Sequence, residues 1–163
     1  MLKGKKIGII NGKNADFQKR ISEGGIFLWD EEYLNSIVPS LCAIIMHDYN
    51  FHICEFEKTF IKVLKNNISA INFNKLIGYK IDSEDPSQPY LECSIHRDYY
   101  FDKITKYRNA IGKLYNDYEP LNKYDFSFKE NSDEDIKRYF GELPKYLIEK
   151  VNSVLELENR NLL

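Results

Sequence analysis

Apolar residues recur every three or four positions along most of the chain, which is the spacing of helices that bury one face. The clearest stretch runs from about Tyr99 to Tyr118, where the apolar positions step by four, three, four, three and four. It should end before Pro120, because the residue preceding a proline avoids the helical conformation. We therefore expect one long amphipathic helix in this region.

The same spacing predicts further helices on either side of this one. They cover residues 31–49, 53–67, 132–141 and 144–155. Pro39 lies inside the first of these and either kinks that helix or restarts it, because proline cannot donate to the preceding turn. A bundle of helices follows from these assignments.

Two regions depart from the helical spacing. Residues 6–10 are β-prone and end at the turn signal Asn11-Gly12, after which Asn14 can cap a short helix that Gly24-Gly25 ends. Residues 68–81 mix helical and strand periods, so they could form either a short helix or a strand. Residues 82–89 have the composition of a loop.

The expected fold class is therefore mainly α. We predict a bundle of four to six helices in one domain, residues 1–163, with a short N-terminal strand or hairpin and a small irregular or β insertion around residues 68–96 as options.

Composition limits the class of protein further. The chain has 163 residues, of which 43% are hydrophobic and 29% charged, and this suits one globular domain without a membrane span. The formal charge of -2 supplies no overall attraction to nucleic acid. An odd count of three cysteines and no signal-peptide core favour reduced thiols and a cytoplasmic location.

A polar motif lies within the clearest helix, in the segment TKYRNAIGKLY, residues 105–115. Arg108-Asn109 resembles the start of the motif of the HEPN superfamily, small helical bundles of toxin–antitoxin and antiviral systems, in which a His follows four to six residues later. The resemblance implies metal-independent RNA cleavage, with His moving a proton and Arg stabilising the phosphorane. Lys113 stands where the His is expected, and an amine with a pKa of about 10.4 can hold a phosphate but does not accept a proton without deep burial.

The sequence therefore favours binding over catalysis. We expect a non-catalytic interaction or regulatory protein, a toxin–antitoxin or antiphage-defence component that binds a protein partner through Arg108, Asn109 and Lys113. One alternative is an RNA-directed HEPN-like ribonuclease in which His47 or His96 supplies the missing base. Another is a small inhibitor or immunity protein, and homodimer formation is compatible with each of these interpretations.

The same residues also have purely structural interpretations. Arg108 can extend its stem over the core and pair with a nearby acid. His52, Cys54, Cys93 and His96 together form a set suited to zinc, but buried thiols are the commoner role for such cysteines. We therefore expect no cofactor, with zinc as the alternative.

Overall fold

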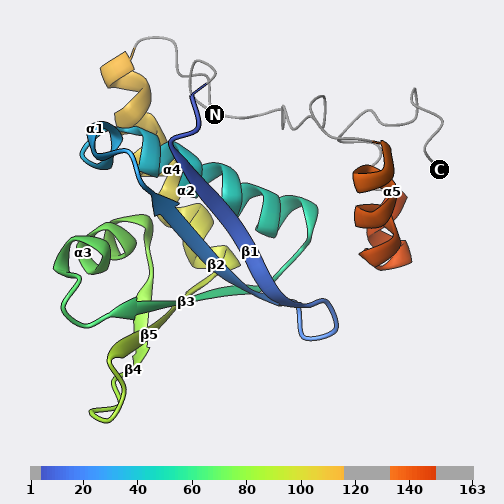
Figure 1. The fold of residues 1–163 in the computed structure, drawn as a ribbon, viewed down its shortest axis with the longest axis horizontal. Helices are drawn as coiled ribbons and strands as arrows, with labels where there is room; N and C mark the ends of the chain where they lie inside the picture. The colour runs from blue at the N-terminus through green and yellow to red at the C-terminus, as the bar shows by residue number, and fades with distance from the viewer. Residues whose placement is uncertain (1–4, 116–132, 150–163) are drawn as a thin grey trace. The chain divides into compact units, whose positions relative to one another are not determined.

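The computed structural model describes residues 5–115 and 133–149. The chain divides into two compact units, Met1–Arg108 and Asn109–Leu163, which are described separately. The first unit is built on a five-stranded mixed sheet with the strand order β1-β2-β3-β5-β4 (Figure 1). Its strands are β1 Gly8–Asp16, β2 Ile21–Leu28, β3 Lys58–Leu64, β4 Lys80–Ser83 and β5 Tyr90–His96. Neighbouring strands pair antiparallel, except β2 and β3, which are parallel.

Helices join β2 to β3 and β3 to β4, and another helix follows β5. They are α1 Glu31–Leu34, α2 Val38–Asp48, the π-helix η1 Tyr49–Ile53, α3 Ile68–Ile77 and α4 Arg97–Tyr115, and the second unit contains α5 Asp133–Glu142. No helix in residues 5–115 and 133–149 is both long and apolar enough to cross a bilayer. The prediction of a mainly α bundle is wrong, because a sheet organises the first unit. The assignment of residues 1–163 to a single domain stays a prediction.

The helix predicted over residues 53–67 is wrong, because its centre is the strand β3. Thr59, Ile61 and Val63 are buried, whereas Lys62 and Leu64 between and after them are exposed. This alternation has a period of two, and the three buried residues are β-branched, which suits a pleated strand. The apolar spacing also fits a helix, since a window this short satisfies both periods.

The N-terminal region is also more extended than expected. The predicted short helix from Asn14 to the glycine pair is absent, and β1 and β2 form a long hairpin that pairs from Gly8 with Leu28 to Asp16 with Ile21. Asn14 has a positive φ of 49° beside the register shift of this hairpin, a conformation that asparagine tolerates. The optional N-terminal hairpin is therefore present, and it is longer than residues 6–10.

One predicted helix is confirmed in its described part, and an open region is now assigned. The long helix is present as α4, although its expected end near Tyr118 lies outside the described residues. Residues 68–81 resolve into helix α3, capped by the Asn67 side chain, followed by the start of β4. Residues 145–149 are helical, and the remainder of the helix predicted over 144–155 lies beyond the described part of the chain.

Helices cover one face of the sheet. A Cβ on Gly24 of β2 would lie 3.0 Å from the Met46 Cε of α2, and the Thr59 hydroxyl of β3 accepts a 3.5 Å hydrogen bond from Asn50 of η1. Ile95, which pairs with Thr59 and shares its face, lies against the end of α3 at Gly78. Figure 1 shows β1 and β2 crossing in front of α2.

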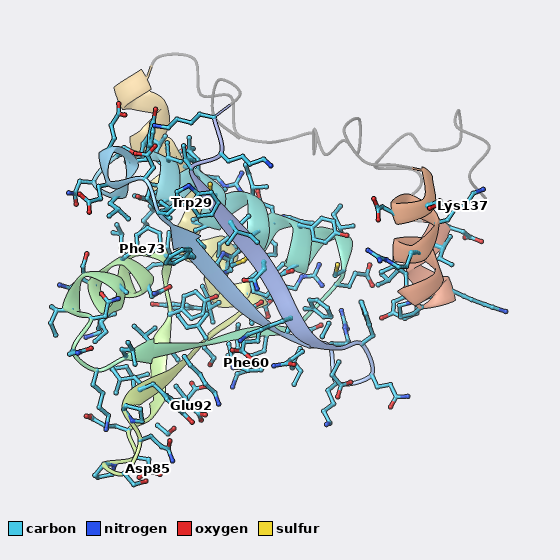
Figure 2. All side chains as sticks on the ribbon, viewed as in Figure 1. Trp29, Phe60, Phe73, Asp85, Glu92 and Lys137 are labelled. Atoms are coloured by element: carbon cyan, nitrogen blue, oxygen red, sulfur yellow. The ribbon has the colours of Figure 1, made fainter. Side chains whose placement is uncertain are left out.

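The opposite face of the sheet carries ion pairs. Lys13 pairs with Glu23, Lys58 with Asp82 and Lys62 with Glu92, at N–O distances of 3.1, 3.0 and 3.5 Å. Figure 2 shows the side chains of the molecule, with Phe60 of β3 and Glu92 of β5 labelled on these strands. This face therefore has charged groups where the helix-covered face has the core.

Gly78 closes α3 in a conformation that only glycine adopts easily, with φ at 121°. A Cβ there would also lie 3.1 Å from the Ile95 Cδ1. We expect Gly78→Ala to lower the free energy of unfolding by about 1–3 kcal/mol, measured by urea denaturation. Gly12→Ala is the control, because a Cβ at Gly12 meets nothing within 4 Å. Equal effects of the two substitutions would contradict a strained position at Gly78.

Candidate functional site

The sheet opens between its two parallel strands. β2 and β3 pair over only three residues each, from Ile21 with Lys58 to Glu23 with Phe60, although β2 continues to Leu28. On their outer sides β3 stays paired with β5 along its whole length, and β2 stays paired with β1 from Ile21 to Leu28 with one register shift. Beyond residues 23 and 60 the described structure pairs no residue of β2 with β3, so backbone groups on the facing edges are left for a ligand.

Two glycines follow the last paired residue of β2. A Cβ on Gly24 would approach Met46, and a Cβ on Gly25 would lie 2.6 Å from the Asn11 Oδ1. Glycine inside a strand often marks a place where another backbone or a ligand comes close. β2 therefore has no side chains at the point where the opening begins.

Buried hydroxyl groups lie at the base of the opening. The Ser22 side chain is 1% exposed, and its Oγ lies 3.3 Å from the Thr59 Oγ1 across the parallel pair. Thr59 is fully buried and also accepts a hydrogen bond from the Asn50 amide. These contacts hold the two strands together immediately before they separate.

Glu23, the residue after Ser22, places its carboxylate on the face of the sheet opposite the helices, where the pairing of β2 with β3 ends. It is 7% exposed, and it accepts a hydrogen bond from the Asn14 Nδ2 at 2.7 Å and pairs with the Lys13 Nζ at 3.1 Å. Burial by itself raises the pKa of a carboxyl group, but the bonds from Lys13 and Asn14 outweigh burial and lower the pKa of Glu23 below its usual value. Glu23 is therefore an ionised carboxylate beside the opening.

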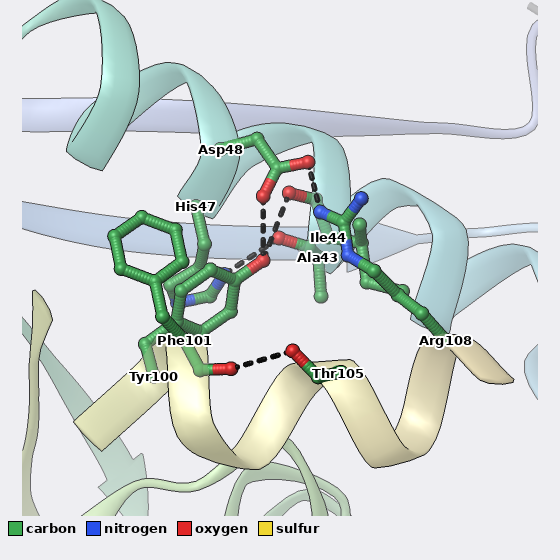
Figure 3. A network of polar contacts seen from close by, with 8 residues as sticks. All are labelled: Ala43, Ile44, His47, Asp48, Tyr100, Phe101, Thr105 and Arg108. Carbon is green, nitrogen blue, oxygen red and sulfur yellow. Dashed lines mark hydrogen bonds and ion pairs between the residues drawn. The ribbon is translucent and has the colours of Figure 1, made fainter. Parts of the chain in front are cut away.

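Arg108 takes part in a buried network on the helix-covered side of the sheet (Figure 3). Its guanidinium is paired with the Asp48 carboxylate of α2, and the Tyr100 hydroxyl donates to the other Asp48 oxygen at 2.9 Å. Asp48 is 1% exposed. Burial works against the charged guanidinium, but Asp48 outweighs burial and raises the pKa of Arg108. Arg108 therefore pairs with a nearby acidic residue, which is the structural alternative to binding that the sequence left open.

The structure describes the rest of the suspected motif only in part, and the use of Asn109 and Lys113 in binding stays a prediction. Asn109 is exposed on α4, and Lys113 lies in α4 at a position whose side chain is not described. The HEPN resemblance is therefore unsupported, since it also required a helical bundle that the first unit does not have.

His47 lies next to this network and is fully buried. Its Nδ1 donates to the Ala43 carbonyl oxygen at 2.6 Å, and its Nε2 accepts from the Tyr79 hydroxyl at 2.7 Å. Burial lowers the pKa of His47 to about 4. A neutral imidazole with both nitrogens occupied inside the core is not placed to act on a substrate.

The four residues considered for zinc lie in two separate parts of the first unit. His52 is in η1, Cys54 follows it, and Cys93 and His96 are in β5. Within residues 5–115 and 133–149, no group of three or more His, Cys, Asp or Glu side chains could hold a metal ion. Cys54 and Cys93 are buried, and the centroid of the His52 ring lies 4.3 Å from that of Phe101.

Reasoning from the sequence missed the opening and Glu23. The pattern assigns the glycine pair to a helix end, although glycines between Ile21 and the apolar run 26–28 are equally a signal of a strand that approaches another group closely. The parallel contact itself joins residues 37 apart in the sequence, and no local pattern reports such a contact.

By sequence, no known protein family matches the chain, and no curated protein matches it either. Solved structures do match. They include a structure from T. thermophilus named as an acetyltransferase, at 12% identity and a TM-score of 0.54, covering 64% of this chain and 60% of that one. Mutant forms of the spermidine/spermine N-acetyltransferase SpeG from Vibrio cholerae match at 16% identity and a TM-score of 0.55, covering 63% and 64%.

A dodecameric spermidine N-acetyltransferase from Vibrio cholerae also matches, at 17% identity and a TM-score of 0.53, covering 60% of this chain and 61% of that one. The chain thus spans less than two thirds of each of these structures. The interpretation as a non-catalytic or HEPN-like interaction protein built on a helical bundle is wrong, because the first unit has an α/β fold that it shares with these acetyltransferase structures.

Proposed function

We propose that this chain transfers an acyl group from a thioester donor to an amine acceptor. One observation carries the proposal: the buried Glu23 carboxylate lies beside the opening between β2 and β3, in a fold shared with acetyltransferases. An extended donor arm entering the opening would form strand-like hydrogen bonds with the unpaired backbone edges. Such bonds would hold the thioester next to the carboxylate.

The reaction can be written with the groups present. The acceptor loses a proton from its ammonium to solvent, its nitrogen attacks the thioester carbonyl carbon, and a C–N bond forms as the C–S bond breaks. The thiol leaves with the second amine proton. Backbone N–H groups facing the opening would stabilise the oxyanion that develops on the carbonyl oxygen. The proposed chemistry requires no metal and no cofactor.

Glu23 would bind the acceptor. It already holds an ammonium group, that of Lys13, whose side chain is 55% exposed and free to swing into solvent. An acceptor ammonium could replace the Lys13 ammonium against the same carboxylate oxygen. A lowered pKa makes Glu23 a weak base but a good partner for a cation. Polyamines are the first acceptors to test, because their several ammonium groups match this requirement.

The choice of donor also follows from the structure. A helix N-terminus after a strand commonly binds phosphate, but the first turn of α2 has few donors to offer. The Ser36 Oγ accepts the Val38 N–H at 3.2 Å, and Pro39 has no N–H. Assays should therefore include an acetylated cysteamine thioester, which has no phosphate, as well as acetyl-CoA.

Glu23→Gln tests the proposal. Loss of a charge-assisted contact to the ammonium should lower kcat/KM for a polyamine about 10- to 100-fold, mainly through KM. The measurement is thiol release together with mass spectrometry of the acylated amine. Glu92→Gln is the matched control, because Glu92 is an exposed carboxylate that pairs with Lys62 on the same face of the sheet.

Two results would count against the proposal. The first is an absence of amine acylation with both donors across polyamines, amino acids and lysine peptides. The second is an equal loss of activity in Glu23→Gln and Glu92→Gln, which would mean that the loss reflects the surface charge in general and not the carboxylate at the opening.

Of the partners considered from the sequence, we retain a second copy of the chain. A solved structure of the same fold is dodecameric, which supports testing the oligomeric state of this protein. We also propose a reducing compartment such as the cytoplasm, a setting that suits an odd count of three cysteines in a chain with a hydrophobic core.

A further inference from the structure

The sheet has two edge strands, and they differ in how they are protected. β4 is four residues long, carries Lys80 and Asp82, and has a register irregularity between Ile81 and Ser83. Short length, charge and irregular register are features that keep an edge strand from pairing with another chain. By these criteria β4 is a protected edge.

β1 lacks this protection over most of its length. It has nine residues, and its pairing with β2 is regular from Gly8 to Lys13. No charged residue or proline occurs in residues 8–12, and Ile9 and Ile10 are 58% and 37% exposed. An exposed, regular strand of this kind is suited to pairing with another strand.

The backbone of β1 presents unpaired groups along this edge. The Trp29 N–H donates to the Ile7 carbonyl oxygen at 3.1 Å, so the backbone of Ile7 faces β2. Backbone direction alternates along a strand, so Asn11 also faces β2, whereas Ile10 and Gly12 direct their N–H and C=O groups outward. In the described part of the chain no strand lies on that side of β1.

We propose that β1 pairs antiparallel with β1 of a second copy, joining the two five-stranded sheets in a symmetric dimer. Pairing centred on Gly12, within the regular part of β1, places Gly12 opposite Gly12 of the other copy. Lys13 then lies opposite Asn11 at the centre of the interface, so no like charges face each other there. The strand is thus complementary to itself, as a two-fold interface requires.

This register places the interface next to the candidate site. Lys13 is bonded to Glu23 on one side, and Asn11 of the second copy would lie on its other side. The dimer does not depend on the proposed acyl transfer, so a protein without transferase activity would still test it.

The test is the molar mass in solution, by light scattering and by sedimentation over a range of concentrations. We expect twice the chain mass of 19.3 kDa at high concentration. Asn11→Lys should weaken the dimer about 3- to 10-fold in Kd, and Asn11→Asp should tighten it by a similar factor, since the contact with Lys13 occurs twice per dimer. The gain with Asn11→Asp should decline at high salt.

Two further variants locate the interface. Gly12→Pro removes an outward N–H at a position with space for a side chain, and should abolish the dimer. Ser83→Lys adds the same charge as Asn11→Lys to the protected edge β4 and should leave Kd unchanged. If circular dichroism shows that Gly12→Pro does not fold, the test rests on the two variants of the exposed Asn11, whose dimer Kd values should shift in opposite directions.

A wild-type protein that stays monomeric at every concentration would overturn the proposal. So would a dimer in which both Asn11 variants leave Kd unchanged, because that dimer would use a different surface.

Discussion

Arg108→Ala should lower the free energy of unfolding by about 3–5 kcal/mol, the cost typical of removing one partner from a buried ion pair. The Arg108 side chain is 12% exposed and that of Asp48 is 1% exposed, so water cannot replace the guanidinium effectively. The truncation leaves the Asp48 carboxylate with the Tyr100 hydroxyl and without a counter-ion. A loss of this size is a large part of the stability of a small domain, and urea denaturation followed by circular dichroism would measure it.

A second substitution separates lost charge from lost packing. Asp48→Asn in the Arg108→Ala background removes the unpaired charge while keeping an acceptor for Tyr100, and should restore about 1–3 kcal/mol. Lys19→Ala is the surface control, because Lys19 pairs with Asp16 while 75% exposed, and it should change stability by less than about 0.5 kcal/mol. If Arg108→Ala lowered the free energy of unfolding no more than Lys19→Ala, the pair of Arg108 and Asp48 would not be buried in solution.

Acid should destabilise the protein through His47. Its pKa in the folded protein is lowered to about 4 from 6.5, so between these values the unfolded chain binds a proton that the folded chain excludes. The contribution to stability is constant above about pH 6.5 and is lost progressively as the pH falls toward 4. The full loss is about 3 kcal/mol, since one pKa unit corresponds to about 1.4 kcal/mol.

The measurement is the free energy of unfolding as a function of pH, compared with His47→Gln. The glutamine variant should be less stable at neutral pH, because it replaces the bonds to Ala43 and Tyr79 imperfectly. It should also lose about one proton of pH dependence between pH 4 and 6.5. Parallel curves for the two proteins would show that His47 is not the group that titrates.

The role of Arg108 depends on a residue outside its own helix. The sequence identifies Arg108 as a residue that departs from the apolar pattern of its helix, and binding and structural pairing are both open to it. The choice between them depends on Asp48, which is 60 residues away in the sequence. A pair that forms only when α2 packs against α4 cannot be read from the helix that carries the arginine.

The sequence does not identify the candidate site for a related reason. Glu23 is not distinguished by sequence from other acidic residues, because its burial depends on β1, which supplies Lys13 and Asn14, and on the hairpin that aligns the two strands. A carboxylate in a local sequence is a surface residue by default. Only its partners turn it into a buried, ionised group.

The sequence by itself determined the elements whose signals are local and long. The apolar spacing from about Tyr99 to Tyr118 extends over five helical steps, enough to separate a period of 3.6 from a period of two, and α4 covers the described part of that stretch. Chain length, charge and thiol count also followed directly from the residues.

The tertiary structure alone decided the sheet. Residues 58–64 satisfy both periods within seven positions, and β3 became a strand because β5 pairs with it along its whole length and β2 pairs with its first three residues. The same pairing fixes where β2 and β3 separate, and so where the candidate site opens. Hydrogen bonds between strands join residues far apart in the chain, so their register, and every group that it buries, is a property of the folded molecule.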